Sequence, residues 1–233
     1  MSQITAPPNA DEILGHFRLP IVRLCGVFVL PCLEIVKIVC RVTWNVRGIE
    51  HVTETLAPVI FASNHQSHLD THVILDVIPQ SQRKRTAAAA AYDHFADREG
   101  TSQKKRCVQF LVSSIWNAFS IERETSPLRS IRTMQTLILK GWSILIYPEG
   151  TRSRTGDIAK FKPGLTLLAK KTRCPVIPIC ILGTKDVLPE ASYFPRKGTV
   201  SVSFGAPILF QDGDTAESFM LRIEDAVKNM AAQ

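Results

Sequence analysis

The chain has 233 residues, of which 45% are hydrophobic and 21% are charged. This length is typical of one domain, and this composition excludes both a disordered tail and a polytopic membrane protein. Lysine and arginine total 28 against 21 aspartate and glutamate, a formal charge of +7. Such an excess favours an anionic partner, which can be nucleic acid, an anionic bilayer or a phosphorylated substrate.

The six cysteines show no closely paired spacing of the kind that binds zinc. Most of them lie in apolar surroundings, where a free thiol behaves as a small hydrophobic side chain. We therefore expect reduced core cysteines, as in a protein that faces the cytosol. The residues are Cys25, Cys32, Cys40, Cys107, Cys174 and Cys180.

Residues 21–46 form the most unusual region, because they are very apolar and lie near a terminus. No signal-peptide pattern precedes them. The longest uncharged run, 24–33, is too short for a spanning helix, which needs about 20 apolar residues. Pro31 is expected to kink or divide the segment, which predicts two short helices in the membrane interface. A helical hairpin packed on the domain is the alternative.

The pattern of the next segments alternates between strands and helices. A strand is predicted over 42–52, and a short buried strand over 59–63 ends directly at Asn64. Residues 69–78 are predicted to form a helix that Pro79 stops. The alanine-rich residues 86–91 are placed as a buried strand, followed by a charged helix or loop over 92–105.

The second half continues the same pattern. A helix that begins with Ser126 as N-cap and Pro127 at its first position is expected to end before Gly141. The other predicted helices cover 110–116, 163–171 and 215–230, and the other predicted strands cover 118–123, 142–147, 174–182 (broken by prolines) and 199–204. This alternation predicts an α/β domain with a mixed, largely parallel sheet flanked by helices.

A histidine and an aspartate, His65 and Asp70, follow the strand 59–63 in the stretch Asn-His-Gln-Ser-His-Leu-Asp. If His65 lies just before the helix and Asp70 in its first turns, the chain can curl to let the two side chains touch. Asp70 would then fix the tautomer of the imidazole and leave its other nitrogen free as a general base. The alternative is that His65 caps the helix and Asp70 is an ordinary first-turn acid.

Two competing chemistries start from the same stretch. His68 and His72 are four residues apart and can share a helical face, where they would bind a metal ion together with Asp70 or Asp76. The glutamate that zinc peptidases place between such histidines is absent here. Ser67 as a nucleophile is disfavoured, since no Gly-x-Ser-x-Gly elbow surrounds it.

A second stretch, Tyr-Pro-Glu-Gly-Thr-Arg-Ser at 147–153, follows a buried strand, where α/β folds place ligand-binding loops. Gly150 lets the backbone approach a ligand, and Arg152 can bind a phosphate with two hydrogen bonds. Glu149 is expected to orient Arg152 or to bind a hydroxyl. Lys162 adds a cation just before Gly164 at a predicted helix N-terminus, which itself attracts anions.

With these motifs, the sequence resembles the glycerolipid acyltransferases of the 1-acylglycerol-3-phosphate acyltransferase type. Residues 64–70 match the family's Asn-His-x-x-x-x-Asp block, and 147–153 match its Phe-Pro-Glu-Gly-Thr-Arg-Ser block with Tyr147 in place of the phenylalanine. Residues 118–123 and 175–179 resemble two further blocks, and 24–41 correspond to the family's amphipathic N-terminal helices. The resemblance thus divides the chain into an N-terminal tail with membrane-interface helices (1–45) and an acyltransferase domain (46–233).

The resemblance implies an acyl transfer in which His65, held by Asp70, deprotonates the free hydroxyl of a lysophospholipid, by default lysophosphatidic acid. The acyl thioester would come from acyl-CoA or an acyl-carrier protein, and no metal, cofactor or covalent acyl-enzyme is required. Arg123 and Arg152 would hold the acceptor phosphate, and Glu149 and Gly150 would shape its pocket. The remaining predicted substrate-binding residues are Asn64, Thr151, Lys162 and Gly164.

One departure from the family leaves the acceptor headgroup open. The block over 118–123 is usually preceded by glycine where this chain has Asn117, and Ser120 replaces a common aromatic residue. Another lysolipid or an acylated amine lipid is therefore an alternative acceptor.

We expect a peripheral or monotopic enzyme on the cytoplasmic face of a membrane with anionic lipids, and no nucleic-acid partner. A non-catalytic binder that uses basic clusters such as Lys104 and Lys105 is the third class considered.

Overall fold

The computed structural model describes residues 9–91, 115–121, 127–153, 155–189, 192 and 194–233. In this part of the chain a seven-stranded sheet has the order β1-β7-β6-β2-β5-β3-β4. The strands are β1 (Val42–Arg47), β2 (Ile60–Ser63), β3 (Thr86–Ala91), β4 (Ala118–Ile121), β5 (Ser143–Ile146), β6 (Val176–Leu182) and β7 (Gly198–Phe204).

The sheet is parallel except at one position. Strand β7 pairs with β6 in antiparallel orientation and with β1 in parallel orientation, and all the other pairs are parallel. The predicted α/β domain with a mixed, largely parallel sheet is therefore confirmed. One prediction that failed concerns the end of an element: the strand expected over 42–52 stops at Arg47, because Gly48 has a φ of +69° and turns the chain into a short helix.

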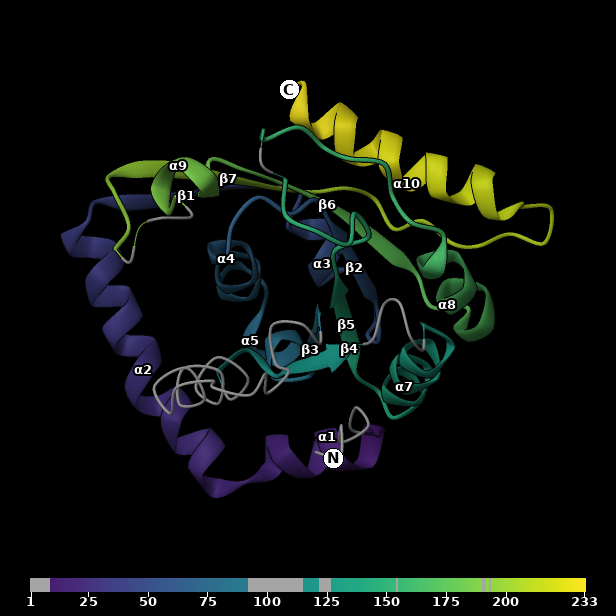
Figure 1. The fold of residues 1–233 in the computed structure, drawn as a ribbon, viewed down its shortest axis with the longest axis horizontal. Helices are drawn as coiled ribbons and strands as arrows, with labels where there is room; N and C mark the ends of the chain where they lie inside the picture. Colours follow the sequence, from purple (N-terminus) through teal and green to yellow (C-terminus); the bar gives the residue numbers. More distant parts are fainter. Residues whose placement is uncertain (1–8, 92–114, 122–126, 154, 190–191, 193) are drawn as a thin grey trace, which may run out of the picture.

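Helices cover both faces of the sheet, as Figure 1 shows. In β2, Ile60 and Ala62 face one hydrophobic core and Phe61 the other, since successive side chains of a strand alternate. The first core includes side chains from α1, α7, α8 and α10, and the second lies against α4. The helices are α1 (Ala10–Arg18), α2 (Pro20–Val39), α3 (Glu50–Thr53), α4 (Leu69–Val77), α5 (Gln80–Arg83), α7 (Pro127–Leu139), α8 (Gly164–Thr172), α9 (Thr184–Val187) and α10 (Ala216–Ala231).

The division of the N-terminal region differs from the prediction. Helix α2 runs without a break through Pro31, and the chain bends instead between α1 and α2, at Leu19 and Pro20. A proline inside a helix leaves the carbonyl four residues earlier without its hydrogen bond. Here that residue is Val27, which is 67% exposed, so its carbonyl can be satisfied outside the protein and the helix continues.

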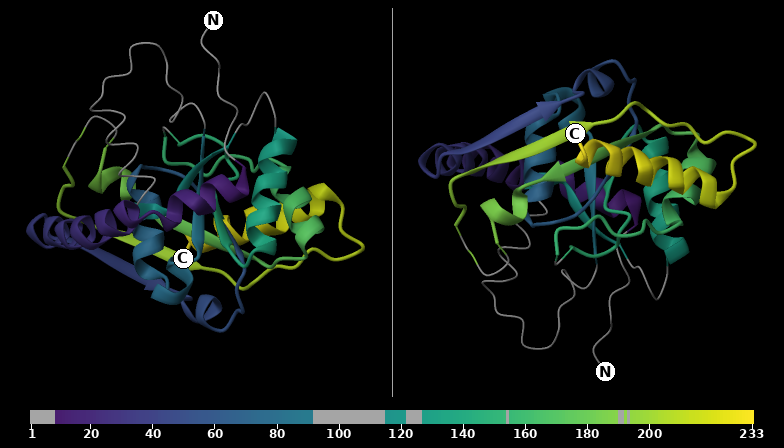
Figure 2. Two further views of the ribbon diagram at one scale, coloured as in Figure 1. Left: turned by 90° about the horizontal axis from the view of Figure 1, so that it is seen from below. Right: turned by 90° about the horizontal axis from the view of Figure 1, so that it is seen from above.

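The two N-terminal helices have different surroundings. Helix α1 buries Ala10, Ile13, Leu14 and Phe17 in the first core. Helix α2 extends along the outside of the molecule to its edge (Figure 2) and exposes large apolar side chains. Among the described residues, no single helix is long and apolar enough to cross a membrane, although α1 and α2, bent by 61°, pass that test as a pair.

The prolines of β6 do not break it, contrary to the prediction. Pro178 lies inside the strand, opposite Ala62 of β2, and its carbonyl accepts a hydrogen bond from the backbone N–H of Gly205 at 2.8 Å. Gly205 comes directly after the end of β7, so the missing N–H of Pro178 falls where the β6–β7 ladder has ended. A proline is tolerated at such a position.

Candidate active site

Both sequence motifs begin at the carboxyl ends of neighbouring parallel strands, β2 and β5. Asn64, directly after β2, is buried, and its side-chain amide pairs with the backbone of Ile181 in β6: it donates to the carbonyl at 2.9 Å and accepts from the N–H at 2.8 Å. This pairing fixes the point at which the chain leaves the sheet.

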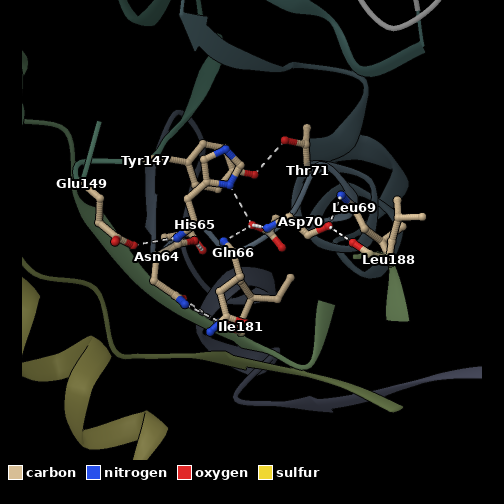
Figure 3. A network of polar contacts seen from close by, with 12 residues as sticks. Asn64, His65, Gln66, Leu69, Asp70, Thr71, Tyr147, Glu149, Ile181 and Leu188 are labelled. Atoms are coloured by element: carbon tan, nitrogen blue, oxygen red, sulfur yellow. Dashed lines mark hydrogen bonds and ion pairs between the residues drawn. The ribbon is translucent and has the colours of Figure 1, made fainter. Parts of the chain in front are cut away.

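The predicted contact between His65 and Asp70 is present. His65 Nδ1 lies 2.7 Å from Asp70 Oδ2, and the same oxygen accepts hydrogen bonds from the backbone N–H groups of Gln66 at 2.6 Å and Ser67 at 2.9 Å (Figure 3). Helix α4 starts at Leu69, so His65 lies before it and does not cap it. Asp70 is fully buried while the His65 side chain is 19% exposed, which leaves the imidazole accessible from one side.

The second motif holds the backbone of His65 at both of its peptide groups. The N–H of His65 donates to Glu149 Oε1 at 2.7 Å, and its carbonyl accepts from the N–H of Ser153 at 2.8 Å. Glu149 Oε2 accepts a third hydrogen bond, from the N–H of Ala159 at 3.0 Å. Glu149 therefore joins the turn after β5 to the loop that carries the histidine. Burial raises the pKa of Glu149, and the two backbone donors act against this shift.

Gly150 has the backbone conformation expected of a glycine at a close approach. Its φ is +81°, and a Cβ added there would lie 2.6 Å from Nζ of Lys162. The Lys162 ammonium group thus lies directly over the glycine. The backbone N–H of Lys162 donates a hydrogen bond to the carbonyl of Pro148 at 2.9 Å. The structure therefore brings the Lys162 cation next to Gly150 of the second motif.

The other predicted substrate-binding residues differ in position. Thr151 is exposed, and Arg152, which is partly exposed, directly precedes the Ser153 that bonds to His65. Gly164 is exposed at the first position of α8. Arg123 lies outside the described residues.

Two side chains near the histidine had no predicted role. The ring of Tyr147, at the end of β5, stacks on the imidazole of His65 with the centroids 3.9 Å apart and the planes at 15°. Its hydroxyl lies 2.7 Å from the hydroxyl of Thr71 on α4. The signal that could have revealed this pair is the departure at position 147, where the family block has phenylalanine.

Asn117 is explained by backbone geometry. Its φ is +47°, in the left-handed region that glycine and asparagine adopt most readily. Its amide donates to the carbonyl of Thr86 at 3.2 Å. The asparagine therefore keeps the turn conformation that a glycine would supply before β4, and it does not by itself indicate another acceptor.

The histidines proposed as alternative metal ligands lie apart from this arrangement. His72 is buried, with its ring at the edge of Trp44 and tilted against Trp116, and burial lowers its pKa. His68 is exposed at the start of α4, and His65 is engaged with Asp70. Within the residues that the structure describes, no three histidine, cysteine, aspartate or glutamate side chains are grouped closely enough to hold a metal ion.

Comparisons with known proteins agree with these motifs. The family model described as Acyltransferase matches residues 43–182. The chloroplastic 1-acyl-sn-glycerol-3-phosphate acyltransferase BAT2 of Brassica napus is 28% identical over 179 residues, which are 73% of this chain and 46% of that protein. A 1-acyl-sn-glycerol-3-phosphate acyltransferase of Limnanthes douglasii is 25% identical over 81% of this chain and 63% of its own.

The chain spans about half the length of the first of these relatives. Among solved structures, the 1-acyl-sn-glycerophosphate acyltransferase PlsC from Thermotoga maritima superposes with a TM-score of 0.67 at 21% sequence identity. The match covers 95% of this chain and 87% of that one. At this identity the likeness establishes the fold.

Proposed function

The chain belongs to the Acyltransferase family, and from this membership we propose that it transfers a fatty acyl group from an acyl thioester to the free hydroxyl of a lysophospholipid. The observation that carries the proposal is the His65–Asp70 pair at 2.7 Å, held at the end of β2 by the turn that follows β5. The names of the relatives support 1-acylglycerol-3-phosphate as the acceptor, with phosphatidic acid as the product.

In the proposed reaction His65 acts as a general base. Nδ1 is paired with Asp70, so Nε2 is the nitrogen that takes the proton from the acceptor hydroxyl. The acceptor oxygen attacks the thioester carbonyl and forms the new C–O bond, and the C–S bond breaks as the tetrahedral intermediate collapses. The imidazolium returns its proton to the departing thiolate. Asp70 stabilises the imidazolium while it exists.

The acceptor phosphate is assigned to the cations at the second motif. The Lys162 ammonium group lies over Gly150, and Lys162 itself stands two residues before Gly164, the first residue of α8. A helix N-terminus and a nearby cation both favour a bound anion. Arg152 and Arg123 complete the proposed phosphate site, with Gly164, Thr151 and the backbone of Gly150 around it.

The proposal includes association with a membrane surface through α2. Its exposed side chains include Phe28 at 65%, Ile38 at 71% and Val39 at 74%. Exposed apolar patches on a protein mark sites that contact other molecules, and both proposed substrates carry acyl chains. We assign α2 to the interface of a cytoplasmic membrane face that contains anionic lipids, which would place the acceptor where the site can reach it.

A direct test is the substitution His65→Ala in the full chain, with His68→Ala as its matched control. Labelled acyl-CoA and acyl-carrier-protein donors are offered to a panel of lysolipid acceptors. We expect His65→Ala to lower turnover by about 10² to 10⁴, and His68→Ala, an exposed residue of the same motif, to stay within about twofold of wild type, as surface substitutions usually do.

Two outcomes would contradict the proposal. Near-wild-type turnover of His65→Ala would exclude the general base, and equal losses in both variants would favour the metal-dependent hydrolase. A non-catalytic binder predicts instead that reversing the charges of Lys104 and Lys105 removes binding while His65→Ala is silent. The acceptor and donor that give the highest turnover identify the headgroup and the source of the acyl chain.

A further inference from the structure

His65 is held from two directions by consecutive residues of one helix. Asp70 binds Nδ1 at 2.7 Å. Thr71, the next residue of α4, reaches the same imidazole through Tyr147, whose ring covers one face of the imidazole (Figure 3). A hydrogen bond at one nitrogen restricts where Nδ1 lies, but leaves the ring able to tilt about that bond. A stacked ring on one face removes this remaining freedom.

The phenol is itself held at both ends. Its backbone directly follows β5, whose last residue, Ile146, pairs with Ala62 of β2, and its hydroxyl is 2.7 Å from Thr71 Oγ1. Burial raises the pKa of Tyr147 well above its usual value, with a smaller contribution from the Asp70 charge, so the hydroxyl stays protonated at neutral pH. A phenylalanine would keep the stack but could not be tied to α4.

We propose that Tyr147 is a positioning residue for His65, and that Thr71 positions Tyr147, so that Nε2 is aimed at the acceptor hydroxyl. This inference rests on the proposed general-base function of His65. The aromatic face adds a second effect, since a cation over such a face is stabilised and the imidazolium forms beneath this ring. Neither residue touches the reacting atoms in this assignment.

The test is a set of four variants in the full chain, namely Tyr147→Leu, Tyr147→Phe, Thr71→Val and the double variant Tyr147→Phe/Thr71→Val. Misplacement of a catalytic group by about 1 Å can cost about 10²-fold in rate. We expect Tyr147→Leu to lower kcat by about that factor with KM within about twofold. Tyr147→Phe keeps the stack and should restore most of this loss.

The double variant isolates the hydrogen bond between the two hydroxyls. A neutral hydrogen bond contributes about 1 kcal/mol, or about fivefold in an equilibrium or rate. Tyr147→Phe and Thr71→Val should therefore each lower kcat by up to about fivefold. The kcat of the double variant should be no lower than that of the less active of these two, because both substitutions remove the same interaction. Independent, multiplying losses would overturn the role assigned to Thr71.

A second readout does not depend on turnover. The imidazole protons of His65, observed by NMR in selectively labelled protein, should be shifted by the Tyr147 ring in wild type and in Tyr147→Phe, and lose that shift in Tyr147→Leu. A wild type without any acyl transfer would contradict the proposed function alone. An active wild type with an unchanged kcat in Tyr147→Leu would overturn the positioning role and leave the proposed function intact.

Discussion

Glu149 accepts a hydrogen bond from the backbone N–H of His65 at 2.7 Å, across a separation of 84 residues in the chain. Both of its carboxylate oxygens accept from backbone donors, since Oε2 bonds to Ala159. The acid of the second motif is therefore occupied in holding the loops of the site together.

The substitution Glu149→Gln should reduce both stability and turnover. Glutamine offers one acceptor oxygen, so one of the two N–H groups would face an amide donor and lose its partner. An unsatisfied buried donor costs about 1–3 kcal/mol, and urea unfolding should show a loss of that size together with a lower kcat. Glu217→Gln, at an exposed position of α10, is the control and should change stability by less than about 0.5 kcal/mol. Equal stability of the two variants would contradict the assignment.

Asn64→Ala separates a structural from a substrate-binding role at that position. The alanine would leave the N–H and carbonyl of Ile181 without their partners in a buried site. We expect a loss of about 2–4 kcal/mol in the free energy of unfolding, with the KM for the lysolipid within about twofold at a temperature where the variant is folded. Unchanged stability with a KM raised tenfold would show instead that Asn64 binds substrate.

Gly150→Ala should act partly through Lys162. A Cβ at position 150 would meet the end of the lysine side chain, which is flexible and would move away, and a left-handed φ of +81° costs an alanine about 1–2 kcal/mol. We expect a higher KM for the acceptor and lower stability. If displacement of the ammonium group causes the rise in KM, Lys162→Met should raise KM similarly, and adding Gly150→Ala to it should raise KM little further. Additive effects would contradict this coupling.

The buried imidazole of His72 predicts a pH dependence of stability. Burial lowers its pKa, with Lys37 and Arg83 adding to this shift and Asp76 and Glu34 opposing it. In the unfolded chain the imidazole titrates near its ordinary value of 6.5, so below that pH the unfolded state binds more protons than the folded state. The contribution of His72 to the free energy of unfolding is therefore complete above about pH 6.5, and it is lost as the pH falls toward the lower pKa that His72 has in the folded state.

Urea unfolding at pH 7.5 and at pH 5.5 tests this expectation. Wild type should lose more stability between the two pH values than His72→Phe, which keeps an aromatic ring between Trp44 and Trp116 but cannot be protonated. The same loss in both proteins would show that His72 does not set the dependence.

The parts that could be predicted from the sequence are those with local causes. An apolar run located β2, a β-rich run closed by proline located β5, and an alternating run located β7. The spacing of His65 and Asp70 allowed their contact to be predicted as one of two alternatives, because the contact is made within one loop and the start of one helix. The pairing of Asn64 with Ile181 and of Tyr147 with Thr71 could not be predicted. Each joins residues far apart in the chain, and their geometry depends on the order of strands in the sheet.

Two of the predictions that failed had been made from proline alone. Pro31 was expected to kink or divide its segment and the prolines of 174–182 to break a strand, but helix α2 is not divided at Pro31 and β6 continues through Pro178. The effect of a proline depends on whether the group it leaves unpaired has another partner, which is a property of the surroundings. Exposure at Val27 and the end of the β6–β7 ladder at Pro178 supply the explanation, and neither is visible in the sequence.

The outer face of α2 also bears on how the purified chain behaves in aqueous buffer. Its exposed residues, which include Ile21, Leu24, Val27 and Phe28, would be buried if two molecules associated through this helix. Burial of apolar area is favourable at roughly 25 cal/mol per Å². The apparent size in gel filtration should therefore rise with protein concentration, and a mild detergent should reverse that rise.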